Sequence, residues 1–112
     1  MYKSFFICVI LVIASLYSCK DKKLEPNCQG DKPTYDNGIA TIINAKCTNS
    51  LCHGVGSSQA EFTTYAGMSL ALSNGNFKKK VLEDQTMPRN DFLTQTQIDL
   101  IQCWVDNGYP EN

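Results

Sequence analysis

The chain has 112 residues, with 10 Lys and Arg, 11 Asp and Glu and one histidine, and its formal net charge is −1. This balance argues against a nucleic-acid-binding protein, because contacts with phosphates need a clear excess of basic residues. The length allows one small domain. A core of that size is modest, so we expect a disulfide or a cofactor to support it.

The N-terminus is typical of an exported lipoprotein. Residues 5–16 form an almost unbroken apolar run behind Lys3, which is long enough for a signal-peptide core and short for a membrane span. The run ends in Leu16-Tyr17-Ser18-Cys19, which resembles a bacterial lipobox, where cleavage falls before the cysteine and the cysteine receives the lipid. We therefore predict a signal peptide over residues 1–18 and an exported protein that is lipid-anchored through Cys19 to a bacterial membrane, on its periplasmic or cell-surface side. The alternative is an ordinary secretory signal with an incidental cysteine.

Residues 19–32 are rich in Lys, Asp, Glu, Asn and Gly, and they show no apolar periodicity. This composition predicts a flexible tether, so the folded domain is expected to span residues 33–112.

The first predicted helix starts after Asp36, which can act as its N-cap. Ile39, Ile42 and Ile43 follow at the i, i+3 and i+4 spacing of an apolar helix face. The helix runs into Lys46 and Cys47, and it therefore delivers Cys47 at its C-terminal end.

Cys47 begins a motif that ends in Cys52-His53. A cysteine pair ending in Cys-His is the arrangement that attaches haem covalently: the two thiols add to the two vinyl groups of the porphyrin, and the adjacent imidazole reaches the iron. The usual motif has two residues between the cysteines, whereas this chain has four. His53 is the only histidine, so it is the sole imidazole that a metal could find in this chain.

Two further helices are predicted. One covers Phe62–Leu72 and ends near residues 73–76. The other opens with a capping box, Thr94-Gln95-Thr96-Gln97, carries an apolar stripe and stops at Gly108 and Pro110. The stripe consists of Ile98, Ile101, Trp104 and Val105. No segment has the pattern of a strand, so the predicted fold class is all-α.

Together, the helix that delivers Cys47 to His53, the later Met87-Pro88 pair and the closing helix resemble class I c-type cytochromes over about residues 35–109. The chain is most similar to small haem domains of exported bacterial lipoproteins that carry a lengthened Cys-Xaa4-Cys-His motif. The resemblance implies three main helices around a haem pocket, with the first and last helices crossing and packing together.

The same resemblance implies the ligands and the activity. Cys47 and Cys52 would bind haem c, His53 would be the proximal ligand of the iron, and Met87 would be the distal ligand. Such a domain is an electron carrier rather than an enzyme, and it exchanges single electrons with a redox partner protein. Met68, the rival methionine, lies on an apolar helical face and is expected in the core.

Two alternatives remain open. In the first, the chain is a binding module without a cofactor that is stapled by disulfides, for example Cys28–Cys103 together with Cys47–Cys52. In the second, Cys47, Cys52, His53 and Cys103 supply four ligands to zinc. If haem occupies the motif, the simplest use of the two remaining cysteines is still a Cys28–Cys103 disulfide that ties the tether to the last helix.

The sequence offers little support for an enzyme. It has no second histidine, no Ser-His-Asp set and no Gly-rich phosphate loop. The basic run Lys78-Lys79-Lys80 is expected to be a solvated surface.

Overall fold

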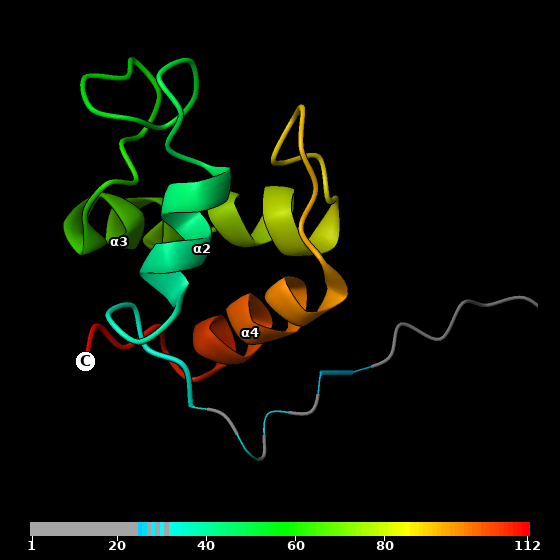
Figure 1. Cartoon of the computed structure of the whole chain (residues 1–112). Helices are drawn as coiled ribbons and strands as arrows, with labels where there is room; N and C mark the ends of the chain where they lie inside the picture. The colour runs from blue at the N-terminus through cyan, green and yellow to red at the C-terminus, as the bar shows by residue number, and fades with distance from the viewer. Residues whose placement is uncertain (1–24, 27, 29, 31) are drawn as a thin grey trace, which may run out of the picture.

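A computed structural model describes residues 25, 26, 28, 30 and 32–112 (Figure 1). The predicted signal peptide, Cys19 and much of the predicted tether lie outside the described residues. The described part is helical and has no strand, so the all-α prediction is confirmed. None of its helices is long and apolar enough to cross a membrane. The elements are α2 (Ile39–Lys46), α3 (Tyr65–Ser73), the π-helical segment η2 (Lys78–Glu83) and α4 (Gln95–Asp106).

The N-cap of helix α2 is Gly38, so the prediction that Asp36 caps this helix is wrong. Gly38 is the N-cap residue with φ +106°, and no side chain caps the helix. A residue with a Cβ rarely adopts this conformation, so glycine determines where the helix begins. The backbone N–H of Asp36 instead donates to the carbonyl of Glu111, 2.9 Å away. The predicted apolar face is confirmed, because Ile39, Ile42 and Ile43 are all buried.

Helix α3 starts at Tyr65, three residues after the predicted Phe62. The side chain of Thr64 accepts a hydrogen bond from the backbone N–H of Gly67 at 3.2 Å, and this N-cap fixes the start. Phe62 lies in the segment before the helix, where its backbone N–H donates to the carbonyl of His53 at 2.9 Å.

The η2 segment was not predicted from the sequence. It buries Val81 and Leu82 behind three exposed lysines, and the backbone N–H of Asp84 donates to the carbonyl of Lys79 at its end. This bond spans five residues, as in a π-helical turn.

Helix α4 has the predicted capping box. Thr94 Oγ1 accepts from the backbone N–H of Gln97 at 3.3 Å, and Gln97 Oε1 accepts from the backbone N–H of Thr94 at 2.9 Å. The helix ends at Asp106, just before Gly108, whose φ is +82°. The predicted stop at Gly108 is therefore confirmed.

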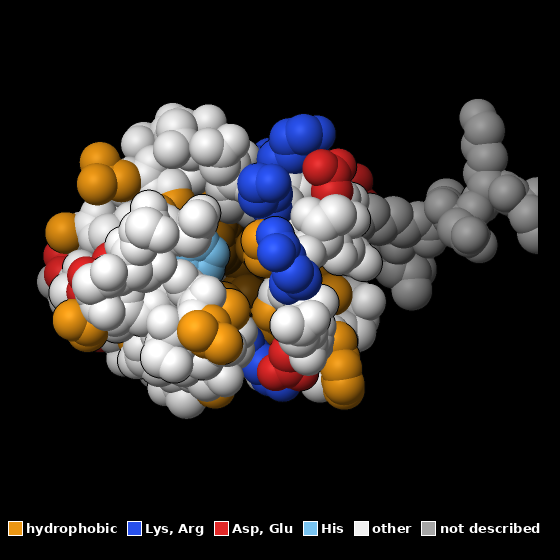
Figure 2. All heavy atoms as spheres, turned by 90° about the horizontal axis from the view of Figure 1, so that it is seen from above, with side chains coloured by type: hydrophobic (Ala, Val, Ile, Leu, Met, Phe, Trp, Pro, Cys, Tyr) orange, Lys and Arg blue, Asp and Glu red, His pale blue; other side chains and the backbone are white. Residues whose placement is uncertain are grey.

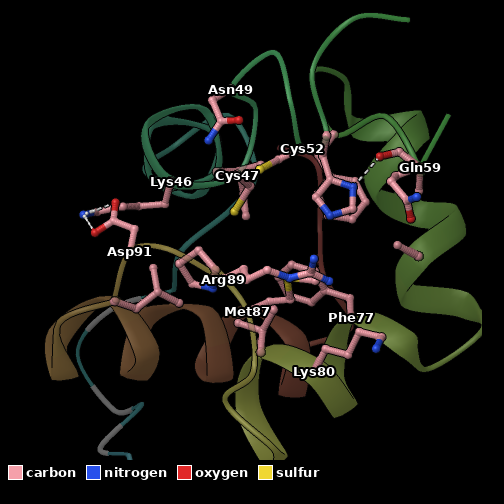
Figure 3. A pocket seen from close by; sticks show the side chains of 18 of the residues that line it. Lys46, Cys47, Asn49, Cys52, Gln59, Phe77, Lys80, Met87, Arg89 and Asp91 are labelled. Atoms are coloured by element: carbon pink, nitrogen blue, oxygen red, sulfur yellow. Dashed lines mark hydrogen bonds and ion pairs between the residues drawn. The ribbon is translucent and has the colours of Figure 1, made fainter. Parts of the chain in front are cut away.

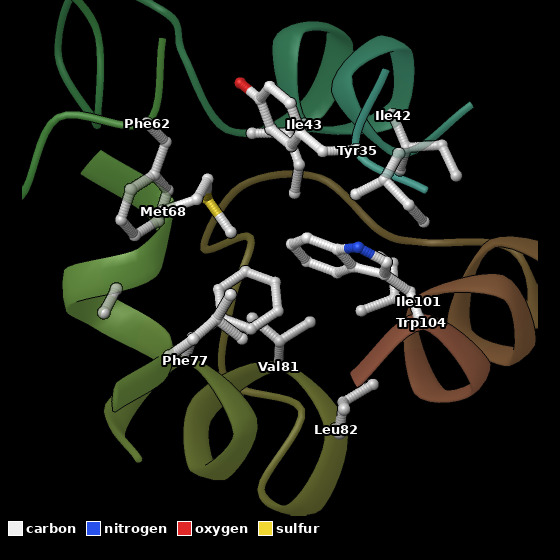
Figure 4. Close-up of a cluster of buried hydrophobic side chains, with 13 residues drawn as sticks. Tyr35, Ile42, Ile43, Phe62, Met68, Phe77, Val81, Leu82, Ile101 and Trp104 are labelled. Atoms are coloured by element: carbon white, nitrogen blue, oxygen red, sulfur yellow. The ribbon is translucent and has the colours of Figure 1, made fainter. Parts of the chain in front are cut away.

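Helices α2 and α4 pack against each other around one core (Figures 1 and 4). Trp104 is fully buried at its centre, and its indole N–H donates to the carbonyl of Pro110 at 2.9 Å. Met68 is also fully buried in this core. The other members are Tyr35, Ile39, Ile42, Ile43, Phe62, Ala71, Leu72, Phe77, Val81, Leu82 and Ile101.

A disulfide joins Cys28 to Cys103, with a Cα–Cα distance of 5.4 Å. This is the pairing that the sequence suggested for the two cysteines outside the haem-type motif, and it ties the tether to α4. The same bond removes Cys103 from the proposed zinc ligands, so the four-ligand zinc site is wrong.

Candidate functional site

One cavity of about 760 Å³ opens between the loop after α2, the η2 segment and the loop before α4. Figure 2 looks down on its mouth, with an apolar floor, the histidine in the hollow and Lys and Arg side chains along one lip. The volume falls within the range of about 300–1,000 Å³ that is usual for ligand and cofactor sites. The cavity is lined by all four residues to which the sequence assigned the haem: Cys47, Cys52, His53 and Met87.

The four residues between the two cysteines form a compact turn. The backbone N–H of His53 donates to the carbonyl of Cys47 at 3.0 Å, and that of Cys52 donates to the carbonyl of Asn49 at 3.0 Å. Thr48 Oγ1 donates to the carbonyl of Asn44 at 2.9 Å, which fastens the turn to α2. The longer spacing is thus absorbed within the turn, and both cysteines reach the same cavity (Figure 3).

Gly54 allows this turn to close. A Cβ on Gly54 would lie 2.8 Å from the carbonyl oxygen of Thr48, which is closer than real Cβ atoms come. The backbone directly after His53 therefore requires glycine.

Cys47 and Cys52 are free thiols and are half-buried. The Cys47–Cys52 disulfide of the cofactor-free alternative is not formed, so that pairing is wrong. Burial raises the pKa of the Cys47 thiol to about 11, and Cys52 and Asp91 add to the shift. Cys47 is consequently a neutral thiol at pH 7, and a neutral thiol is a poor nucleophile.

His53 is held by two contacts. Its Nδ1 lies 2.6 Å from the carbonyl oxygen of Ala60, and its ring stacks on Phe62 with the centroids 4.0 Å apart and the planes at 11°. A carbonyl only accepts, so Nδ1 carries the proton and Nε2 keeps a lone pair for a metal.

Met87 approaches the cavity from the side opposite the cysteines (Figure 3). It lies in the loop of residues 84–94, hereafter the Met87 loop, and is half-buried. The carbonyl of Lys80 accepts from the backbone N–H of Thr86 at 2.9 Å and of Met87 at 3.2 Å, which fixes the loop to η2. Met68 does not line the cavity.

Charged side chains also border the cavity. Lys80 and Arg89 are exposed residues at its wall. Lys46 forms an ion pair with Asp91, with Nζ 2.9 Å from Oδ2. Hydrogen bonds from Lys46 and from the backbone N–H of Phe92 lower the pKa of the Asp91 carboxyl below its usual value.

The donors at this cavity are two thiols, one imidazole and one thioether, and the floor is apolar. The apolar lining includes Ile43, Phe62, Phe77, Val81 and Ile101. These are the groups that a covalently attached haem requires from a protein. Among the described residues, no three His, Cys, Asp or Glu side chains come together as a site for a bare metal ion.

Several residues of the site were not singled out from the sequence. Ala60 contributes only a backbone carbonyl, which no side-chain pattern reveals. The Lys46–Asp91 pair joins residues 45 positions apart, and their charges alone gave no reason to connect them. Arg89 directly follows the Met-Pro pair, and that position was the one available sign of its place at the cavity.

Comparisons with protein-family models, curated proteins and solved structures find no match for this chain.

Proposed function

We propose that residues 33–112 form a c-type cytochrome domain that carries single electrons. One observation carries this proposal: a single cavity collects the two free cysteines of the described domain, the only histidine and Met87, which faces the cysteines from the opposite side. Cys47 and Cys52 would bind haem c through thioether bonds, and His53 and Met87 would be the axial ligands of its iron. The packing of α2 on α4, with the cysteine motif directly after α2, also suits a cytochrome c-like fold.

Haem iron supplies one-electron redox chemistry by changing between the ferric and ferrous states. The protein's part is to hold the ligands and to keep water out. The Ala60 carbonyl and the Phe62 ring fix His53 in one tautomer and one orientation, while the Lys80 carbonyl holds the backbone of Met87. Fixed ligands in an apolar cavity keep structural change small when an electron is gained or lost.

The cations at the cavity wall suit the acidic edge of the porphyrin. Lys80 and Arg89 line the cavity, and their charges would balance the two carboxylates of a haem. Within this proposal, the anchor at Cys19 keeps the domain at a membrane, where it exchanges electrons with a redox partner protein.

Covalent attachment is tested by producing the chain with a cytochrome maturation system. The wild-type protein is expected to keep haem after denaturation and acid-organic extraction and to show a reversible reduced-minus-oxidised spectrum. Cys47→Ala/Cys52→Ala should lose the haem, because both thioether bonds are gone. The matched control is Cys28→Ser/Cys103→Ser, which removes two cysteines that do not line the cavity and should keep the haem. Correctly matured wild-type protein without haem would instead favour a cofactor-free binding module.

The distal ligand is tested with Met87→Ala. Covalent haem should remain, while the reduction potential falls and carbon monoxide gains access to the ferrous iron, because the thioether that favours the ferrous state has been removed. Met68→Leu is the control, since Met68 is fully buried outside the cavity and its loss should change neither property. Unchanged potential and unchanged carbon monoxide access in Met87→Ala would assign the distal position to another group.

A further inference from the structure

The Lys46–Asp91 ion pair stands out for its geometry. Lys46 Nζ lies 3.0 Å from Asp91 Oδ1 and 2.9 Å from Oδ2, so it contacts both carboxylate oxygens. The ammonium also lies 5.4 Å from the centroid of the Phe92 ring, within the distance of a cation–π contact. Asp91 Oδ1 accepts a further hydrogen bond from the backbone N–H of Phe92 at 2.7 Å. The carboxylate is thus held by the backbone of the next residue as well as by Lys46.

The pair connects the two sides of the cavity. Lys46 is the last residue of α2 and directly precedes Cys47, whereas Asp91 lies four residues after Met87 in the Met87 loop. The start of this loop is held by the Lys80 carbonyl, through the backbone N–H groups of Thr86 and Met87. The Lys80 carbonyl therefore holds the start of the loop, up to Met87, against η2. The Lys46 side chain holds Asp91, on the other side of Met87, against α2.

We infer that the Lys46–Asp91 pair holds the Met87 loop closed against α2 and thereby positions Met87 on the iron. This inference rests on the proposed function and deepens it. Lys46 and Asp91 are positioning residues, because they act on the ligand through the loop and do not themselves bind the group in the cavity. Breaking the pair leaves the Lys80 contacts in place, so the loop opens more often but does not detach.

The size of the effect follows from the exposure of the pair. The side chain of Lys46 is 23% exposed and that of Asp91 is 42% exposed, so water and salt screen their attraction. Partly exposed ion pairs change an equilibrium by a factor of up to about five. The open population of the loop, and with it the rate of carbon monoxide binding to the ferrous protein, should rise by about two- to fivefold when the pair is lost.

The test uses the matured full-length protein and the variants Lys46→Met and Asp91→Asn. Carbon monoxide binding to the ferrous form is followed by rapid mixing, together with the reduction potential and the melting temperature. Both variants should bind carbon monoxide about two- to fivefold faster than the wild type. Lys46→Arg, which keeps the charge, should restore the wild-type rate. Raising the salt concentration should accelerate binding to the wild type and leave Lys46→Met unchanged.

Lys79→Met is the matched control, because Lys79 and Asp84 form the other ion pair among the described residues, with Nζ 3.3 Å from Oδ2 and no link to α2. It should bind carbon monoxide at the wild-type rate. Covalent haem with the same carbon monoxide rate in Lys46→Met, Lys79→Met and wild type would overturn this inference and leave the proposed function standing. Loss of covalent haem from the wild type would overturn both. A fall in melting temperature without a change in carbon monoxide rate would reduce the pair to a stabilising contact and would also overturn the inference.

Discussion

The protonation state of the Cys47 thiol decides how readily it reacts, and under the proposed function this thiol must stay intact until haem is attached. Burial, followed by the nearby Cys52 and Asp91, raises its pKa from an ordinary 9.0 to about 11. A neutral thiol resists oxidation and alkylation, since the thiolate is the reactive form. The half-buried position of Cys47 therefore slows both reactions at its thiol.

The alkylation rate of Cys47 in the haem-free protein measures this protection. At pH 8, a pKa raised by two units lowers the thiolate fraction by about 100-fold, so iodoacetamide should label Cys47 far more slowly in the native protein than in urea. The native rate should rise as the pH approaches 11. Peptide mass mapping separates Cys47 from Cys52. Equal labelling of Cys47 in native and urea-unfolded protein at pH 8 would show that the thiol is not buried.

The same shift affects stability. Because the folded pKa lies above the unfolded one, the stabilisation from the protonated thiol is complete below pH 9 and is lost as the pH rises through about 11. The haem-free protein should therefore unfold at lower urea concentration at pH 11 than at pH 8, and this difference should shrink in Cys47→Ala.

At the residue scale, the sequence predicted the side chains that line the cavity better than the residues that hold those side chains in place. Cys47, Cys52 and His53 lie within seven consecutive residues, so their common location follows from spacing alone. Met87 reaches the same cavity from a distant loop, and only the resemblance to cytochromes pointed to it. The stacking of Phe62 on His53 and the Lys46–Asp91 pair depend on how the helices pack, which no local pattern encodes.

Among the described glycines, Gly67 in the first turn of helix α3 has the least room for a side chain. A Cβ on Gly67 would lie 1.9 Å from the carbonyl oxygen of Glu61, so the chain before α3 crosses directly over its first turn. That chain includes Ala60 and Phe62, the two residues that hold His53. Gly67 therefore allows the segment that contains Ala60 and Phe62 to pass close to α3, in the position where these two residues contact His53.

Replacing Gly67 with Ala should destabilise the protein by about 1–3 kcal/mol, because the added methyl group overlaps a backbone atom that cannot move freely. Helix propensity alone predicts the opposite sign, a gain of about 1 kcal/mol. Urea unfolding of the variant decides between the two. Ala66→Gly, at the exposed neighbouring position of the same helix, serves as a control for propensity and should cost about 1 kcal/mol. A Gly67→Ala variant that is more stable than the wild type would show that the segment before α3 leaves room for a methyl group at Gly67.

The helices differed in how well the sequence predicted them, and the reason is local. Helix α4 has a capping box, an apolar stripe and a terminal glycine, and each of these signals was correct. The N-cap of helix α2 is a glycine with positive φ. The sequence instead favoured the nearby Asp36, because aspartate is a more common N-cap residue. The η2 segment escaped prediction because only Val81 and Leu82 are buried, behind three lysines, so no helical period is visible.

Over the described part of the molecule, the residues near Cys28 and the loops around the cavity lie on different sides of the helices (Figure 1). The described residues near Cys28 run below α4 in Figure 1, whereas the loops that surround the cavity lie at the far end of α2. The Cys28–Cys103 disulfide fixes this arrangement.

The disulfide should also account for a large part of the stability of this small domain. Its two cysteines are 75 residues apart, and closing a loop of that length restricts the unfolded chain by about 4 kcal/mol in the chain-entropy treatment. Cys28→Ser/Cys103→Ser should therefore lower the free energy of unfolding by up to about 4 kcal/mol in urea titrations. Wild-type protein unfolded with a reductant present should match the variant. Under the proposed function, the loss should leave the spectrum of the haem-loaded protein unchanged, because neither cysteine lines the cavity. A variant that keeps wild-type stability would contradict the stabilising role of the bond, and one that loses its haem spectrum would show that the disulfide shapes the cavity as well as the tether.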